Sequence, residues 1–211
     1  MTEPEPIRVL FVCTGNSARS VMAEALLRQH GGDAFEVHSA GTEPKGINPL
    51  TLRVLAEAGI DASWARSKSV DEFRGQSFDY VVTVCDQARQ VCPVFPGVHE
   101  SLHWGYEDPA AAEGSDEERL AVFRKVFIQL GERIRQFATV EALLTAAGDP
   151  ERPVLAGHDP DFSELLALLC DTENAPMRKG AFARIEADRP LRPGGGTLRW
   201  LIAPDALRPA R

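Results

Sequence analysis

The sequence predicts an α/β protein in which a parallel sheet carries helices on both faces, in three layers, followed by a small α/β C-terminal appendage. β-prone apolar runs alternate with helical patterns over the first 138 residues, which is typical of a parallel sheet. Glycine and proline separate these segments, as turns require. Cys13 and Cys85 end two of the predicted strands, the position at which such sheets bind ligands.

The first β-α-β unit has clear boundaries. IRVLFV (7–12) is apolar and β-branched, so it reads as a strand buried on both faces. Residues 20–30 carry apolar side chains at helical spacing and stop at a Gly-Gly pair. FEVHSAG (35–41) is the next predicted strand.

Three further elements complete the predicted sheet domain. Residues 49–59 form a helix that opens with proline and closes with glycine. FDYVVTVC (78–85) is strongly β-prone. Residues 116–137 begin with acids and repeat apolar residues three and four apart, as a covering helix does.

The pattern changes after about residue 138, and we place a domain boundary at 138–150. The predicted domains are therefore 1–138 and 139–211. The second contains a helical EALLTAA, a strand-like VLAGH, a helical DFSELLALLC and two strand candidates near 181–187 and 197–203, with PGGG between the last two.

Composition excludes several classes of function. With 23 basic and 31 acidic residues the formal net charge is −8, so neither nucleic acid nor an acidic membrane surface is an expected partner. The N-terminus lacks the pattern of a signal peptide, and no run of about 18 apolar residues occurs, so we expect a cytoplasmic protein. The four cysteines match no zinc spacing, and we expect neither metal nor cofactor.

The loop after the first strand has the composition of an oxyanion site joined to a nucleophile. Between Cys13 and Arg19 lie Thr14, Gly15, Asn16, Ser17 and Ala18, whose small side chains leave backbone N–H groups free to converge. A following helix N-terminus adds positive potential, and Arg19 offers a bidentate fork. The same donors, with the Ser20 hydroxyl, favour a Cys13 thiolate. An isolated C-x5-R pattern is commonly an ordinary turn, but here a strand precedes it and a helix follows.

VLFVCTGNSARSVMAEAL resembles the phosphate loop of the low-molecular-weight protein tyrosine phosphatase fold, and in particular its arsenate reductase branch. The resemblance continues through SAGTEP, YVVTVCDQARQVCP and HWGYEDPA, and so covers residues 7 to about 137. It implies that Cys13 attacks arsenate held by the loop and Arg19, while Asp108 of the EDPA segment acts as general acid.

The resemblance also assigns Cys85 and Cys92 to a disulfide relay. Cys85 would attack Cys13 and release arsenite, Cys92 would attack Cys85, and thioredoxin would reduce the resulting disulfide. The six-residue polar spacer between these cysteines must be able to move or unwind, because each sulfur has to reach the previous one. Trp104 and Tyr106 fit the HWG-x-x-DPA pattern of the reductases better than the paired aromatics of the phosphatases.

Two details of the pattern bear on the site. Relatives often carry a second cysteine where Ala18 stands, so the relay is expected to run through Cys85. Some reductases of this fold bind potassium near residues matching Asn16, Glu24 and Ser39. Arg66 and Lys68 lie in the segment where further ligands would be sought, and their charge argues against a bound cation.

The C-terminal segment resembles the C-terminal half of phosphohistidine phosphatases of the histidine phosphatase superfamily. RPVLAGHDPDFSELLALL, APMRKGAFARIE and GTLRWLIAP carry this resemblance, and His158 matches the histidine of its GH motif. The nucleophilic histidine of an Arg-His-Gly motif is missing from the chain, so we expect a non-catalytic remnant. Cys170 is most simply a core residue.

Three functions stay open from the sequence. The leading one is thioredoxin-coupled arsenate reduction, with a small thiol as the alternative reductant. A low-molecular-weight protein tyrosine phosphatase would need Cys13, Arg19 and Asp108 but not the other two cysteines. A phosphate-sensing module without turnover would need only the loop.

Overall fold

The computed structural model describes residues 5–97, 99–146, 182–187 and 196–202. Contacts divide the chain into two compact units, Met1–Ala142 and Leu143–Arg211. None of the helices in the described ranges is long and apolar enough to cross a membrane.

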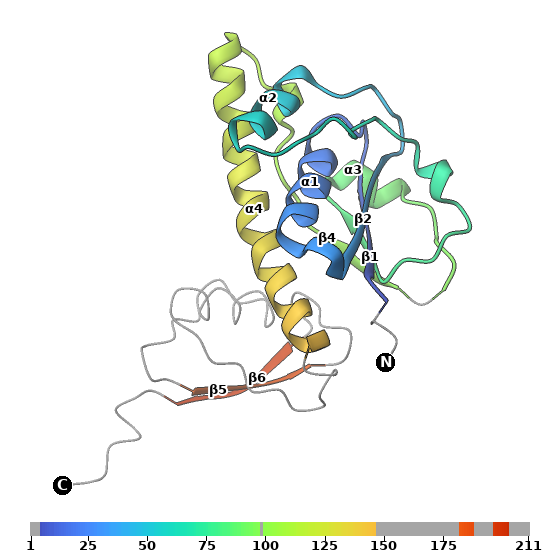
Figure 1. Ribbon diagram of the computed structural model, residues 1–211, viewed down its shortest axis with the longest axis vertical. Helices are drawn as coiled ribbons and strands as arrows, with labels where there is room; N and C mark the ends of the chain where they lie inside the picture. The colour runs from blue at the N-terminus through green and yellow to red at the C-terminus, as the bar shows by residue number, and fades with distance from the viewer. Residues whose placement is uncertain (1–4, 98, 147–181, 188–195, 203–211) are drawn as a thin grey trace, which may run out of the picture. The chain divides into compact units, whose positions relative to one another are not determined.

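The first unit is built on a four-stranded parallel sheet in the order β2-β1-β3-β4 (Figure 1). Its strands are β1 (Ile7–Cys13), β2 (Phe35–Gly41), β3 (Tyr80–Thr83) and β4 (Glu100–His103). The register pairs Cys13 with Gly41 and Val12 with Thr83. The predicted parallel sheet is confirmed. Strand β4 was not predicted, because its four residues ESLH carry too little apolar pattern.

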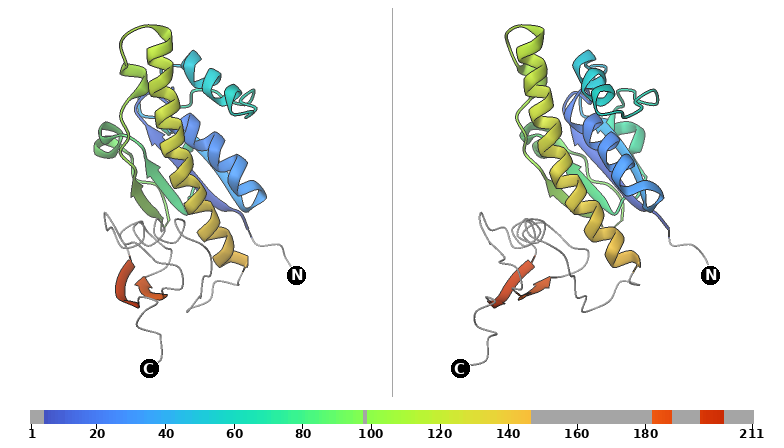
Figure 2. Two further views of the ribbon diagram at one scale, coloured as in Figure 1. Left: turned by 90° about the vertical axis from the view of Figure 1, so that its left-hand side faces the viewer. Right: turned by 60° about the vertical axis from the view of Figure 1, so that its left-hand side comes forward.

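Helices α1 (Arg19–Gly31) and α4 (Asp116–Ala146) cover one face of this sheet (Figure 2). A methyl group added at Gly131 of α4 would lie 3.7 Å from Leu26 of α1, so these two helices pack closely. The ring of Phe137 in α4 packs at a tilt against Phe35 and edge to face against Tyr80, whose side chains point to this face. The helix continues past Phe137 to Ala146, so EALLTA (141–146) extends the predicted helix rather than starting another.

The opposite face is closed by an aromatic cluster. His38 of β2 contacts Phe73, in the 3₁₀ helix η2 (Val70–Phe73), and also Phe78. Phe78 in turn meets Phe95 edge to face. Because side chains alternate along a strand, Phe35 and Val37 point to one face and His38 to the other, and the sheet is buried on both.

The remaining elements of the first unit are α2 (Pro49–Glu57), α3 (Asp86–Val91) and two 3₁₀ turns, η1 (Gly32–Ala34) and η3 (Pro109–Ala111). Helix α2 starts where Asn48 caps it and Pro49 occupies the first turn. The chain leaves β1 toward β2 on one side and later reaches β3 on the other. The carboxyl ends of β1 and β3 therefore form the crevice of the fold.

In the second unit, β5 (Phe182–Ala187) and β6 (Gly196–Ile202) pair antiparallel. Both predicted strand candidates are confirmed. The predicted VLAGH strand and DFSELLALLC helix, with His158 and Cys170, lie outside the described residues. The division into functional domains at 138–150 stays a prediction.

Candidate active site

The segment Thr14–Ala18, here called the oxyanion loop, joins the end of β1 to the start of α1. Backbone N–H groups of residues 42–48 donate hydrogen bonds to four backbone carbonyl groups of Cys13 and the loop. The donor and acceptor residues are Thr42 to Cys13 at 3.1 Å, Glu43 to Thr14 at 2.8 Å, Lys45 to Gly15 at 2.9 Å and Asn48 to Ser17 at 3.0 Å. In a trans peptide the C=O and the following N–H point in opposite directions. Outward carbonyls thus leave the loop's N–H groups directed inward, where they form a nest for an anion.

Gly41 permits this close packing. A Cβ atom there would lie 2.7 Å from the carbonyl oxygen of Thr14 and 2.8 Å from the backbone nitrogen of Asn16. Both neighbours are backbone atoms that cannot swing away. The glycine of SAGTEP is therefore a requirement of the loop, a role that the sequence alone did not reveal.

Cys13 lies at the base of the loop, 3% exposed. The backbone N–H of Asn16 donates to its Sγ at 3.1 Å, and the Ser20 Oγ lies 3.0 Å from the same sulfur. The N-terminus of α1 adds its positive dipole end, since the helix begins at Arg19. These three groups surround the sulfur that the sequence predicts to be the nucleophile.

Asn16 is held by a buried polar network below the loop. Its backbone has a φ of 42°, unusual for a side-chain-bearing residue. The side-chain Nδ2 donates to the Oγ atoms of Ser20 and Ser39, both at 2.9 Å, and its Oδ1 accepts from the N–H of Lys68 at 2.6 Å. The strained residue is therefore fixed from several directions, which keeps the loop in one shape.

Glu24, fully buried, completes the network. It accepts a hydrogen bond from Ser39 and ion pairs with Lys68 at 3.0 Å and Arg28 at 2.7 Å. The residues matched to a potassium site, Asn16, Glu24 and Ser39, do meet here. However, the Glu24 carboxylate is already neutralised by two cations, so this donor set does not fit a further one. Arg66 pairs instead with Glu72, at the surface.

Arg19 and Asp108 meet at the rim of the loop. Nη2 of Arg19 lies 3.0 Å from Oδ2 of Asp108, and Nη1 donates to the carbonyl of Tyr106 at 3.0 Å. Asp108 caps the turn η3, accepting from Ala110. The guanidinium fork expected to hold an anion is thus engaged by a carboxylate in this structure.

Two aromatic residues secure the segment that carries Asp108. Trp104 is 1% exposed and packs against Phe11 of β1. Burial raises the pKa of Tyr106, so its phenol is neutral at physiological pH. The Trp104 ring is therefore committed to the core, whereas Tyr106 is half-buried at its edge.

Cys85 lies beside the oxyanion loop. Its Sγ is 3.4 Å from the hydroxyl oxygen of Thr14, the residue next to Cys13, and it accepts from the Ala88 N–H at 3.4 Å. Cys85 is the N-cap of α3, so its sulfur lies at the start of that short helix. The structure therefore places the second predicted thiol against the loop that follows the first.

Cys92 stands at the other end of α3, as its C-cap. Burial raises the pKa of the Cys92 thiol. The six residues of α3 separate it from Cys85, so the two positions lie roughly 10 Å apart along the axis. A disulfide needs Cα atoms within about 7 Å, so the two can join only if α3 unwinds. The polar spacer of the sequence is a helix in the reduced protein.

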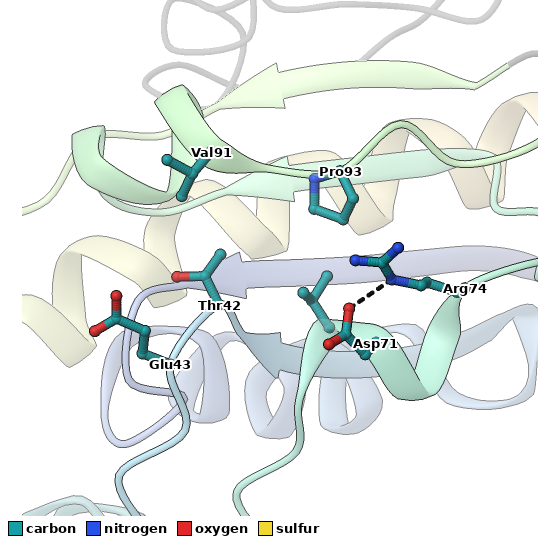
Figure 3. A pocket seen from close by; sticks show the side chains of 7 residues that line it. Thr42, Glu43, Asp71, Arg74, Val91 and Pro93 are labelled. Carbon is teal, nitrogen blue, oxygen red and sulfur yellow. Dashed lines mark hydrogen bonds and ion pairs between the residues drawn. The ribbon is translucent and has the colours of Figure 1, made fainter.

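A shallow pocket borders this end of α3 (Figure 3). Figure 3 shows Val91 and Pro93 above Thr42 and Glu43 on one side and the Asp71–Arg74 ion pair on the other. Val91 is 59% and Val94 94% exposed, so apolar side chains flank Cys92 at the surface.

The sequence was compared with known families and structures. The sequence profile described as low molecular weight phosphotyrosine protein phosphatase matches residues 8–147. An arsenate reductase of Halalkalibacterium halodurans is 48% identical over 130 residues, which are 62% of this chain and 94% of that protein. The profile match includes the oxyanion loop, Cys85, Cys92 and Asp108.

Solved structures agree with these matches. An arsenate reductase from Archaeoglobus fulgidus aligns with a TM-score of 0.52 at 34% identity, covering 62% of this chain and 98% of its own. A thioredoxin-dependent arsenate reductase from Corynebacterium glutamicum aligns with a TM-score of 0.51 at 33% identity, covering 67% and 65% respectively. The predicted fold class is confirmed.

Proposed function

The chain belongs to the low molecular weight phosphotyrosine protein phosphatase family, and we propose that it reduces arsenate to arsenite with electrons from thioredoxin. The observation that carries the proposal is the placement of three thiols. Cys13 lies in the oxyanion loop, Cys85 contacts the loop through Thr14, and Cys92 ends the helix that Cys85 begins. A hydrolase needs only the first of them.

Arsenate binds in the nest of N–H groups contributed by the oxyanion loop. To bind the arsenate oxygens, Arg19 has to release the Asp108 carboxylate. Arsenate replaces it as a partner that can accept two parallel hydrogen bonds from the guanidinium. The displaced carboxylate then stands beside the bound anion. Asp108 is positioned to act as the general acid.

In the first step the Cys13 thiolate attacks arsenic. A sulfur–arsenic bond forms, an arsenic–oxygen bond breaks, and the departing oxygen takes a proton from Asp108 and leaves as water. Arsenic is still pentavalent in this adduct. Ser20 and the Asn16 N–H contact the attacking sulfur.

In the second step the Cys85 thiolate attacks the Cys13 sulfur. A Cys13–Cys85 disulfide forms, and the electron pair of the broken sulfur–arsenic bond stays on arsenic, which leaves as arsenite. Two sulfurs are oxidised and one arsenic is reduced by two electrons. Phosphorus offers no comparable route, so the same loop with phosphate gives only hydrolysis.

In the third step the Cys92 thiolate attacks Cys85 as α3 unwinds, and Cys13 leaves as a thiolate ready for another turnover. Thioredoxin then reduces the Cys85–Cys92 disulfide. Val91 and Val94 supply apolar contact surface beside it for such a partner. This thiol chemistry belongs in a reducing compartment, the cytoplasm.

The proposal is tested by arsenate-dependent NADPH oxidation with thioredoxin and thioredoxin reductase. Cys85→Ser and Cys92→Ser should each abolish multiple turnover, whereas Cys170→Ala, the matched control at the remaining cysteine, should retain it. Full multiple-turnover activity in both serine variants would refute the relay. Replacing thioredoxin with glutathione in the same assay tests the small-thiol alternative.

The C-terminal segment has a separate place in the proposal. We propose that residues 139–211 are a non-catalytic remnant of a histidine phosphatase fold, because His158 has no nucleophilic histidine to serve. His158→Ala should leave arsenate reduction unchanged. Hydrolysis of phosphohistidine that depends on His158 would contradict this part.

A further inference from the structure

One contact between a histidine and a carboxylate, an ion pair when the imidazole is protonated, ties the redox helix α3 to the sheet. Nε2 of His103, the last residue of β4, lies 2.9 Å from Oδ1 of Asp86, the first residue of α3. Nδ1 of the same ring lies 2.9 Å from the hydroxyl oxygen of Thr83. Both ring nitrogens are used, so the orientation of the imidazole is fixed between β3 and α3.

The backbone below this pair is shaped to admit it. A Cβ atom at Gly105 would lie 3.2 Å from Nε2 of His103 and 3.7 Å from Oδ1 of Asp86. The glycine of HWGYEDPA therefore leaves space for the two side chains to meet. No other ion pair involves α3 in the part of the chain that the structure describes.

Asp86 belongs to the turn that the relay has to dismantle. That turn contains the hydrogen bonds from Ala88 N–H to the Cys85 sulfur and from Arg89 N–H to the Cys85 carbonyl. Both are lost when the Cys85 sulfur bonds to Cys92 and the intervening residues form a loop. The ion pair with His103 is thus a contact of the reduced, helical state.

We propose that His103 is a positioning residue that latches α3 in its reduced form through Asp86, and thereby sets the reduction potential of the Cys85–Cys92 pair. The proposal rests on the relay of the proposed function. A contact present only in the dithiol state stabilises that state, so the latch raises the potential. The disulfide is then easier for thioredoxin to reduce.

The expected shift in reduction potential is small because Asp86 is exposed to solvent. The Asp86 side chain is 86% exposed, and exposed ion pairs are weak. We expect loss of the latch to favour the disulfide two- to fivefold, which corresponds to a potential roughly 9–21 mV lower. The latch is weak enough to open during each turnover.

The test is a redox titration of the full-length Cys13→Ser protein, in which Cys85 and Cys92 are isolated from the nucleophile. The protein is equilibrated with mixtures of oxidised and reduced dithiothreitol, and the disulfide fraction is read by alkylation and mass spectrometry. Asp86→Asn, His103→Gln and the double variant are compared in this background. Asp33→Asn, an exposed acid on η1, is the control for the change of charge.

We expect each single variant to lower the potential and the double variant to lower it by less than the sum, because the two residues act as one pair. A role of Asp86 through the helix dipole alone would give additive shifts and an unaffected His103→Gln, and would overturn the latch. Unchanged potentials in all three variants would also overturn it. If no Cys85–Cys92 disulfide forms in the parent protein, the relay itself fails, and the latch with it.

Discussion

The oxyanion loop and the redox helix lie side by side but are held very differently. Below the loop, Asn16, Ser20, Glu24 and Ser39 have no exposed surface, and they bond to one another. Helix α3 is six residues long, and Asp86 and Val91 near its ends are mostly exposed. One region is fixed from every side, and the other is tied at few points.

The difference matches the chemistry that we propose for each region. An anion site is effective when its donors are already aimed, because no reorganisation is then needed during the reaction. A relay segment has to change shape in every turnover, so a low free energy of local unfolding is an advantage. The same crevice therefore combines a rigid anion-binding loop with a helix of low local stability.

Asp108→Asn removes the proposed general acid and tests whether the oxyanion loop still binds an anion without it. Turnover should fall by roughly 10²- to 10⁴-fold, because the departing oxygen loses its proton donor. Phosphate should bind more tightly, because a neutral amide competes less well for Arg19 than the carboxylate does. Steady-state kinetics and calorimetric titration with phosphate measure the two effects.

The control for Asp108 is Glu107→Gln, which removes the neighbouring negative charge where it pairs with Lys125. This variant should change phosphate affinity much less. An equal increase in phosphate affinity in the two variants would mean that binding depends on overall charge rather than on the Arg19–Asp108 contact.

Gly41→Ala breaks the rigid region directly. The new methyl group would press on the Thr14 carbonyl and the Asn16 nitrogen, so the loop has to shift. A displacement of about 1 Å at a catalytic group can cost on the order of 10²-fold in rate, and we expect a loss of that size. Arsenate reduction and phosphate binding should decline together.

Gly131→Ala is the matched control for Gly41→Ala, since its methyl group would meet Leu26 at an ordinary 3.7 Å and lies within a helix. This control should leave activity intact and raise the melting temperature slightly. Full activity in Gly41→Ala would show that the loop tolerates movement, and the contrast between the two regions would be lost.

The two regions also differ in how far the sequence predicted them. Strand β1, the loop and α1 follow one another along the chain, so local pattern was sufficient to place Cys13, Asn16 and Arg19. The contacts of the loop with the segment after Gly41 join distant positions, and no local pattern encodes them. Helix α3 was missed because six residues show too little periodicity. Lys68 was singled out for its charge, but its contact with Glu24 required the fold.

The smallest predicted effect concerns Cys92 and probes helix α3. Burial raises the pKa of this thiol, so at pH 8 a smaller fraction is thiolate in the folded protein than in an unfolded one. In the Cys13→Ser, Cys85→Ser background, iodoacetamide should alkylate native Cys92 about two- to fivefold more slowly than the urea-unfolded chain. The difference should shrink as the pH rises through the raised pKa.

The same pKa shift has a consequence for stability. A thiol with a raised folded-state pKa contributes stability that is fully present below its unfolded pKa and is lost as the pH rises through the folded one. Cys92→Ala in that background should therefore reduce the dependence of the melting temperature on pH in the alkaline range. Equal alkylation rates for the native and unfolded chains at pH 8 would mean that α3 already exposes Cys92. The reduced helix would then present no barrier to the relay.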